Sequence, residues 1–228
     1  MTGSLILVST PIGNIEDISP RAIEAMKNCD ILIVEERKPA NRLLSQLGIK
    51  KDYLLLNEHT TKETTEEAFD ALLDGKTIAL ISDAGTPLLA DPGSLLVRKV
   101  LEIGIKVTAV PGASSILPAL QLSGFSLTSF TFVGFLSRDK KERAAELRNL
   151  RDRKETLIFL EAPYRLQQII DDLAKGIGEK REAAVCCDLT MKEEKVIRGT
   201  FTEIREHFAQ KPFKGEFVIV VHGFGRSK

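Results

Sequence analysis

Short, almost purely apolar runs alternate with longer stretches of mixed polarity through the first half of the chain. The runs cover residues 5–8, 31–34, 78–81 and 107–110. Apolar runs without alternation are typical of strands buried on both faces of a parallel sheet. Helix signals separate them: Ser19-Pro20 fits an N-cap and first helical residue, Thr64 and Glu67 fit a capping box, and Gly75 and Gly104 fit C-cap positions. This pattern predicts a three-layer α/β domain with a parallel sheet.

The second half of the chain has strand candidates that are richer in aromatic and β-branched residues. They cover residues 130–133, 156–160, 183–186 and 217–221, and helical stretches at 141–150, 163–174 and 203–209 separate them. Pro111-Gly112 and Gly124 interrupt the pattern between the halves, where a domain boundary is expected. We therefore expect two α/β domains, residues 1–115 and 116–228.

Four loops leave the predicted strands of the first domain at their carboxyl ends. They cover residues 10–14, 35–38, 82–87 and 111–115, and they concentrate Gly, Pro, Asn, Ser and carboxylates. In an open parallel sheet, ligands bind beyond this edge. The loop at 82–87 combines small residues, which let a backbone approach a ligand closely, with the single charge of Asp83. The four loops together predict a ligand crevice.

Several ligand classes are disfavoured by what the loops lack. Gly13 stands alone, without a G-x-G-x-x-G dinucleotide loop, and neither a G-x-x-x-x-G-K-[ST] phosphate loop nor a G-x-S-x-G nucleophile elbow occurs. The histidines lack metal-ligand spacing, so no metal is expected. His59 beside Glu58 is either a general base or a packed or solvated side chain. Neutral loops with one or two carboxylates suit an adenosyl group that carries a positive sulfonium better than a phosphate.

The charge of the chain is balanced overall but uneven locally. Lys and Arg total 32 and Asp and Glu total 32, which argues against a generic nucleic-acid binder. Residues 138–154 nevertheless hold eight basic side chains against four acidic ones. This stretch is either a solvated helix face with i,i+4 ion pairs or a contact surface for an anionic substrate.

Cysteine usage and apolar run lengths bear on the compartment. Cys29, Cys186 and Cys187 are odd in number and include no C-x-x-C pair, so we expect buried, reduced thiols. No apolar run approaches the roughly 20 residues that span a bilayer, and residues 5–8 are too short for a signal-peptide core. We expect a cytoplasmic protein without membrane contact.

The loop motifs resemble those of the tetrapyrrole-methylase superfamily. The matching segments are Thr10-Pro11-Ile12-Gly13-Asn14, Ser82-Asp83-Ala84-Gly85-Thr86-Pro87, Asp91-Pro92-Gly93, Pro111-Gly112, Leu189-Thr190 and Lys214-Gly215-Glu216. Within the superfamily they are most similar to the enzymes that methylate a cytidine 2′-hydroxyl of 16S ribosomal RNA. The resemblance implies S-adenosylmethionine as methyl donor, two α/β domains with the cofactor folded between them, a homodimer, and ribosomal RNA or the small ribosomal subunit as partner.

The resemblance also assigns expected roles to residues. Cofactor contacts are expected from Pro11, Asp83, Ala84, Gly85, Leu88, Ala113, Ser114, Leu189, Gly215 and Glu216. A 2′-hydroxyl is a weak nucleophile, so a nearby base would help, and the candidates are Glu36, Glu35 and Asp91. Substrate contacts are expected from Asn14, Arg37, Lys38 and Arg165.

The chain departs from the RNA enzymes on the substrate side. Their E-D-T-R after the second strand reads Glu35-Glu36-Arg37-Lys38 here, and a lysine loses the bidentate phosphate geometry of an arginine. Three hypotheses therefore stand. RNA 2′-O-methylation leads, a methylase of a tetrapyrrole or another small metabolite is the second, and a non-catalytic protein that binds S-adenosylmethionine is the third.

Overall fold

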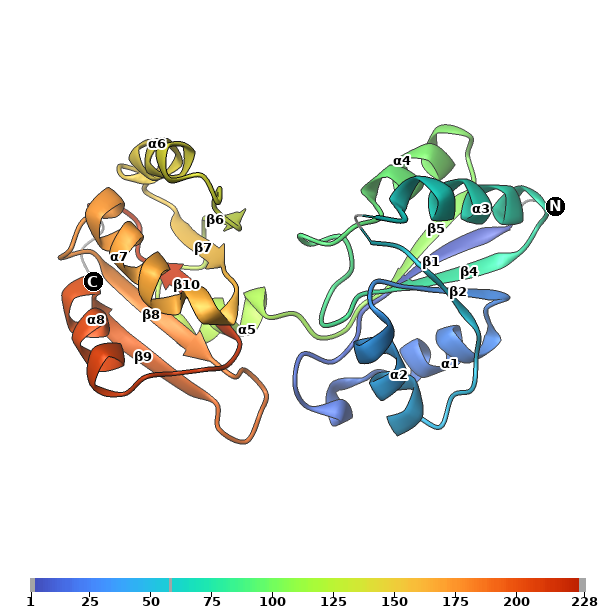
Figure 1. The fold of residues 1–228 in the computed structure, drawn as a ribbon, viewed down its shortest axis with the longest axis horizontal. Coiled ribbons are helices and arrows are strands. Elements are labelled where there is room, and N and C mark those ends of the chain that lie inside the picture. The colour runs from blue at the N-terminus through green and yellow to red at the C-terminus, as the bar shows by residue number, and fades with distance from the viewer. Residues whose placement is uncertain (1–2, 58, 226–228) are drawn as a thin grey trace. The chain divides into compact units, whose positions relative to one another are not determined.

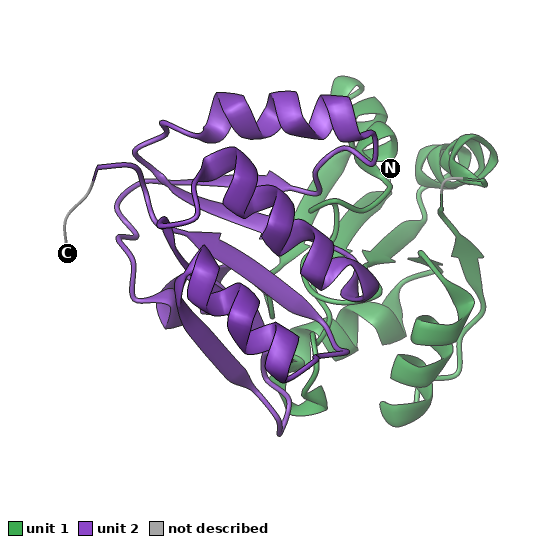
Figure 2. Ribbon diagram, turned by 60° about the vertical axis from the view of Figure 1, so that its left-hand side comes forward, with its two compact units in different colours: residues 1–114 green, residues 115–228 purple. Residues whose placement is uncertain are grey.

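The computed structural model describes residues 3–57 and 59–225. The chain divides into two compact units, residues 1–114 and 115–228, and each has its own five-stranded sheet (Figure 2). Glu58, which the sequence places beside the candidate base His59, lies outside the described residues. The mixed α/β class is confirmed.

The sheet of the first unit is parallel throughout. Its strands are β1 (Ser4–Val8), β2 (Ile31–Val34), β3 (Tyr53–Leu55), β4 (Thr77–Ile81) and β5 (Lys106–Val110), in the order β3-β2-β4-β1-β5. Helices α1 (Pro20–Asn28) and α2 (Arg37–Gln46) cover one face, and α3 (Thr61–Leu73) and α4 (Ser94–Glu102) cover the other (Figure 1). The short helix η1 (Ile15–Asp17) follows β1. All carboxyl strand ends therefore meet at one edge, as predicted.

Burial on both faces explains why these strands are continuously apolar. In β2, Leu32 and Val34 enter the core beneath α1 and α2, whereas Ile33 enters the core beneath α3 and α4. Successive side chains of a strand point to opposite faces, so a strand between two helical layers requires an apolar residue at every position.

The second unit has a mixed sheet. Its strands are β6 (Phe130–Gly134), β7 (Thr156–Leu160), β8 (Glu182–Cys187), β9 (Lys195–Thr200) and β10 (Phe217–Val221), in the order β6-β7-β10-β8-β9. Only β6 and β7 are parallel among these described pairs. Helices α6 (Lys140–Leu150), α7 (Leu166–Ile177) and α8 (Phe201–Gln210) share one core, and η2 (Pro163–Arg165) leads into α7. Helix α5 (Ile116–Ser123) contacts the other face, where the Cys186 thiol lies 3.7 Å from the Ala119 carbonyl.

Some local predictions hold and others are wrong. The Ser19 hydroxyl accepts from the Ala22 N–H at 3.1 Å, so it caps α1 as expected. The capping box at Thr64 is wrong, because α3 begins at Thr61 and the Thr64 hydroxyl donates to the Leu55 carbonyl at 2.5 Å. Strands β3 and β9 were not predicted, since β3 has three half-buried residues and β9 is a polar edge strand. Arg37 belongs to the first turn of α2 rather than to a loop.

The three cysteines are free and buried. Burial raises the pKa of the Cys186 and Cys187 thiols to about 12, so both are protonated at neutral pH. Within the described part of the chain, no helix is long and apolar enough to cross a membrane. The same residues contain no cluster of His, Cys, Asp and Glu that could hold a metal ion.

Helix α7 approaches α6 closely enough to require a glycine, which gives a first prediction. A Cβ at Gly176 would lie 2.6 Å from the Leu147 Cβ, a separation that core packing does not tolerate. Gly176→Ala should lower the free energy of unfolding by about 1–3 kcal/mol, despite the better helix propensity of alanine. Urea unfolding measures the difference, with the exposed Lys175→Ala as the matched control on the same helix. Equal or greater stability of Gly176→Ala would contradict this close packing.

Candidate functional site

Hydrogen bonds tie the loops after β1 and β4 together. Thr10 and Gly85 exchange backbone bonds, with the Thr10 N–H to the Gly85 carbonyl at 2.9 Å and the Gly85 N–H to the Thr10 carbonyl at 3.0 Å. The Thr10 hydroxyl also donates to the Ser82 carbonyl at 3.0 Å. The loop after β5 joins them, because the Thr86 hydroxyl donates to the Ala113 carbonyl at 3.2 Å. Three strand ends thus form one connected surface.

Two glycines allow this close approach of the loops. Gly85 has a φ of +85°, and a Cβ there would lie 3.2 Å from the Ile12 side chain. A Cβ on Gly112 would lie 3.0 Å from the Ser9 Cβ. The glycines of both motifs are therefore required by packing between loops, in addition to any contact with a ligand.

The segment after β4 holds backbone strain. Leu88 and Ala90 have φ values of 71° and 68°, which side-chain-bearing residues rarely adopt. Among the described residues other than glycine, only Asp188 and Thr190 share this property. Strain of this kind concentrates at ligand sites, where the surrounding structure imposes it. Both strained segments coincide with the motifs that the sequence assigned to cofactor binding.

Asp83 and Asp91 are carboxylates held in partly buried positions. The Asp83 carboxylate accepts from the Glu36 N–H at 3.1 Å and so caps α2 from another loop. Burial raises the Asp83 pKa above its usual range, and the nearby Glu36 and Asp91 charges raise it further. Burial also raises the Asp91 pKa, while a hydrogen bond with the Ser82 side chain opposes that rise. A partly desolvated carboxylate at a cleft edge marks a candidate functional group.

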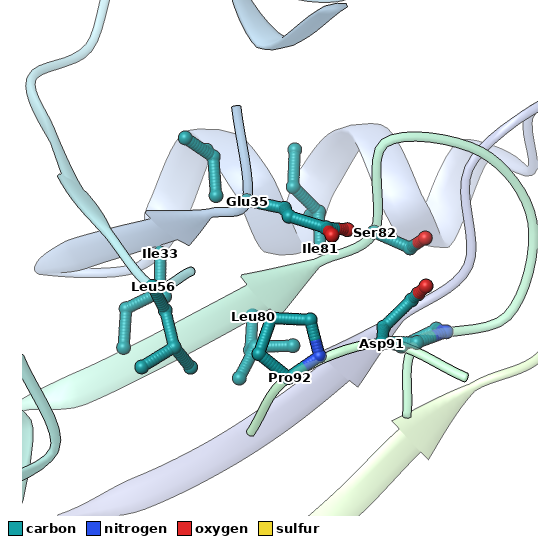
Figure 3. A pocket seen from close by; sticks show the side chains of 10 residues that line it. Ile33, Glu35, Leu56, Leu80, Ile81, Ser82, Asp91 and Pro92 are labelled. Atoms are coloured by element: carbon teal, nitrogen blue, oxygen red, sulfur yellow. The ribbon is translucent and has the colours of Figure 1, made fainter. Parts of the chain in front are cut away.

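Asp91, Ser82 and Glu35 line one small pocket at this edge. Its volume for water-sized molecules is only about 10 Å³, and its remaining walls are apolar. Figure 3 shows the Ser82 hydroxyl and the Asp91 carboxylate pointing toward one another, with the Glu35 carboxylate extending toward Ser82. A cavity needs roughly 10–15 Å³ by this measure to hold one water molecule, so this pocket suits at most one small polar group of a larger ligand.

The first unit gathers most of the predicted site residues at this one edge. On its loops lie Pro11, Asn14, Glu35, Glu36, Asp83, Ala84, Gly85, Leu88, Asp91, Ala113 and Ser114, and Arg37 and Lys38 lie in the first turn of α2. The side chains of Glu36, Arg37 and Lys38 are exposed. The Asn14 side chain accepts from the Glu16 N–H at 3.1 Å, so Asn14 also caps η1.

The second unit brings the remaining predicted cofactor residues together. The Asp188 N–H donates to the Glu216 carbonyl at 2.8 Å, which joins the loop after β8 to the loop before β10. A Cβ on Gly215 would lie 2.3 Å from the Asp188 carboxylate, so any larger residue would have to displace that side chain. Leu189 is buried, and burial with the Asp188 charge raises the pKa of Glu216.

Arg165, expected to contact substrate, pairs inside the second unit. Its Nε lies 3.5 Å from the Glu161 carboxylate, and the two side chains are only 11% and 4% exposed. Glu161 follows β7 directly. Removal of one partner of such a pair would leave the other charge buried without compensation, which is costly. The pair therefore fixes the segment between Glu161 and Arg165. A substrate contact by Arg165 stays a prediction.

The sequence interpretation missed residues that organise the site. Ser82 and Thr10 are buried at 3% and 1% exposure, and their bonds position Asp91 and Gly85. Both are the first residues of recognised motifs but were given no role, and a polar residue at the end of an apolar run was the available signal. Asp188 and Thr190 surround Leu189 with strained backbone, which no sequence pattern reveals.

Comparisons with known proteins agree with this site. Residues 4–205 match the family model described as tetrapyrrole (corrin/porphyrin) methylases. The chain is 40% identical to ribosomal RNA small subunit methyltransferase I of Halalkalibacterium halodurans, over 98% of the chain and 77% of that protein. It is 41% identical to the Bacillus subtilis protein of the same name, over 97% and 75%. A crystal structure of diphthine synthase has a TM-score of 0.73 at 16% identity, over 96% and 89%, and supports the fold alone.

The chain belongs to the tetrapyrrole methylase family, which confirms the resemblance seen in its loops. It is a methyltransferase, and S-adenosylmethionine is its methyl donor. The described residues fit this donor. The loops at this edge place the small residues Gly13, Ala84 and Gly112 at exposed positions. The partly buried carboxylates of Asp83 and Asp91 complement a positive sulfonium better than a phosphate.

The charge of Asp83 can be separated from its capping role. Asp83→Asn keeps an oxygen that accepts from the Glu36 N–H but removes the negative charge. We expect S-adenosylmethionine affinity to fall about tenfold, or about 1.4 kcal/mol. S-adenosylhomocysteine, whose sulfur is neutral, should change much less. Calorimetric titration of both ligands measures the difference.

The same titrations, repeated over a range of pH, give a further test. Because the Asp83 pKa is raised, the wild-type preference for the charged ligand should shrink as pH falls through that pKa, where the carboxyl becomes neutral. Asp83→Asn should show a smaller preference and no such dependence. Equal losses for both ligands would instead indicate a structural role for Asp83.

Proposed function

We propose that this chain transfers the methyl group of S-adenosylmethionine to RNA of the small ribosomal subunit, at the 2′-hydroxyl of a cytidine in 16S ribosomal RNA. The observation that carries the proposal is 40% identity over 98% of the chain to a protein named for methylation of that RNA. The loop motifs at the carboxyl edge resemble those of cytidine 2′-O-methyltransferases. This resemblance is the reason for assigning the methyl group to the 2′-hydroxyl.

Methyl transfer needs alignment more than covalent help from the protein. S-adenosylmethionine supplies a methyl group on a positive sulfur, which becomes neutral as the group leaves. The loop surface that Thr10, Gly85 and Thr86 hold together would orient the donor and exclude water. We assign donor contacts to the first-unit residues Pro11, Asp83, Ala84, Gly85, Leu88, Ala113 and Ser114, and to Leu189, Gly215 and Glu216 of the second unit.

Asp91 is the best supported of the three candidate bases. Its partly buried carboxylate has a raised pKa, which favours acceptance of a proton, and it lies beside Ser82 in the pocket. Glu35 lines the same pocket and is the second candidate. Glu36 has an exposed side chain, and its backbone N–H is engaged by Asp83. In the proposed reaction, the Asp91 carboxylate takes the proton of the 2′-hydroxyl as the oxygen bonds to the methyl carbon.

Exposed polar groups near these carboxylates suit an RNA backbone. Arg37 and Lys38 project from the first turn of α2, whose N-terminus is itself favourable to phosphate. Asn14 lies on the neighbouring loop after β1. These three residues, with Arg165, are our assigned substrate contacts.

A metabolite methylase is the alternative function. The family description names corrin and porphyrin methylases, and Arg37 and Lys38 replace residues typical of the RNA enzymes. Methyl transfer to small-molecule extracts, but not to ribosomal subunits, would support this alternative.

We further propose a cytoplasmic homodimer. Strand β6 is an edge strand of its sheet, and its Phe130 side chain is 42% exposed. An aromatic side chain on an open edge favours association with a second copy. Sedimentation analysis should give a dimer for the wild type and a smaller species for Phe130→Glu.

Substitution of Asp91 tests the proposed base. Asp91→Asn should lower kcat for methylation of small ribosomal subunits about 10²- to 10⁴-fold, while S-adenosylmethionine affinity falls no more than it does in Asp83→Asn. Wild-type kcat should fall as pH drops through the raised Asp91 pKa, because a protonated carboxyl cannot accept a proton. Transfer of labelled methyl groups to subunits lacking the modification measures both effects.

Matched variants distinguish which of the three carboxylates is the base. Glu35→Gln and Glu36→Gln should retain most of the activity. A larger loss of kcat for Glu35→Gln than for Asp91→Asn would identify Glu35 as the base instead. Failure of the active, cofactor-bound wild type to methylate ribosomal subunits would refute the proposed function.

A further inference from the structure

The acidic residues around α6 are used within its own loop and helix. The Asp139 carboxylate accepts from the N–H groups of Lys141 and Glu142 at 2.8 and 2.9 Å. Glu142 accepts from the Ser137 hydroxyl at 2.7 Å, and Glu146 accepts from the Ser137 N–H at 3.0 Å. These carboxylates order the connection between β6 and α6, and none of the three forms an ion pair within the described residues.

One basic residue of the same stretch is also structural. Arg143 is 4% exposed, and its Nε lies 2.7 Å from the Asp172 carboxylate on α7. Its Nη1 donates to the Ser137 and Arg138 carbonyls at 2.8 and 3.0 Å. Arg143 therefore anchors α6, and it cannot bind a substrate without releasing that anchor.

The remaining cations of α6 and its flanks face outward. The α6 basic face consists of the exposed residues Arg138, Lys140, Lys141, Arg148 and Arg151. Within the described ranges, none of these five lies within ion-pair distance of a carboxylate. The face is solvated, as one of the two interpretations expected, but the i,i+4 ion pairs of that interpretation are absent from the described residues of this stretch.

Helix stability does not account for this charge. Lys140 and Lys141 occupy the first turn, where the N–H ends of the helix carry partial positive charge and cations are unfavourable. Asp139 offsets this as the N-cap, but a neutral residue at either lysine position would serve the helix better. The retained charge points to a partner outside the fold.

The α6 basic face is also held rigidly. Leu147 is buried against α7, where the absence of a side chain on Gly176 allows close contact. Arg143 adds its ion pair. Lys141 and Arg148 are two helical turns apart, on the order of 10 Å. A row of cations over that length, on an anchored helix, matches several phosphates of a nucleic-acid strand. Figure 1 shows α6 near the β6 edge of its sheet.

We infer that the α6 basic face binds the phosphate backbone of the RNA substrate, outside the site where the methyl group is transferred. This inference rests on the proposed function. It identifies the surface of the second unit that gives a chain without net charge its attraction for RNA. Backbone contacts of this kind position the substrate and leave the choice of nucleotide to the site.

A charge-matched pair of triple variants tests the inference. Lys140→Gln, Lys141→Gln and Arg148→Gln together remove three charges from the face. The control combines Lys50→Gln, Lys76→Gln and Lys106→Gln, which are exposed near the amino ends of β3, β4 and β5, away from the site edge. Both proteins carry the same net charge, so any difference reports position. The readouts are KM and kcat for small ribosomal subunits, RNA affinity against salt, and S-adenosylmethionine affinity.

The face variant should raise KM for subunits about tenfold or more at 0.1 M salt. Its slope of log affinity against log salt should shrink by about 2–3, since each lost phosphate contact contributes about 0.7–0.9. The kcat at saturating subunit and the S-adenosylmethionine affinity should stay at wild-type values, and the control should behave as wild type.

Three outcomes would overturn the inference or its basis. Unchanged KM and salt slope in the face variant would refute the inference while the wild type still methylates RNA. An equal loss in the control would refute it as well, because net charge alone would then explain the effect. Absence of methyl transfer to RNA by the wild type would refute the proposed function and this inference with it.

Discussion

The paired backbone bonds between Thr10 and Gly85 are the interaction on which the site depends. A parallel sheet brings its carboxyl ends to one edge, but it does not join the loops that leave them. Thr10 is almost fully buried, so its N–H and carbonyl need partners, and Gly85 supplies both at 2.9 and 3.0 Å. Each such bond contributes only about 1 kcal/mol net, yet leaving either group unpaired would cost more. The Thr86 bond to Ala113 then adds the third loop, and the donor surface becomes one body.

The connected loop surface holds two carboxylates in partly buried positions, where their charged form is destabilised. Burial raises the pKa of both Asp83 and Asp91, which means that the folded protein pays a desolvation penalty for their charges. The strained backbone of Leu88 and Ala90 between them is a second local cost. Neither feature improves packing, and both lie on the segment that the family motif marks. A positive sulfonium would relieve the first cost on binding, so these features favour a cationic ligand.

The sequence predicted the parts of the fold that burial determines and missed those that tertiary context determines. Residues 31–34 had to be a strand between two helical layers, because every position is apolar. Strand β9 could not be recognised, since its polar residues are tolerated only at the edge of a sheet. Thr64 has the sequence of a cap, but its hydroxyl bonds to Leu55 from inside α3. The motifs placed Asp83 and Asp91 at the site, whereas the positive φ of Asp188 depends on the neighbouring loop that carries Gly215.

The charged residues also show what the sequence predicts and what only the structure reveals. A count over residues 138–154 gives an excess of cations but does not say which of them are available. In the structure, Arg143 is buried in an ion pair with Asp172, and Glu142 and Glu146 accept from Ser137. The five exposed cations of the α6 basic face lie outside ion-pair distance of the described carboxylates and are the available ones. A protein with no net charge has little long-range attraction for RNA. Because salt screens exposed charges beyond about 8–10 Å, its affinity must come from cations concentrated where the strand lies. Neutrality of the whole chain and a basic α6 surface are therefore compatible, and together they favour recognition at one surface over general adhesion to nucleic acid.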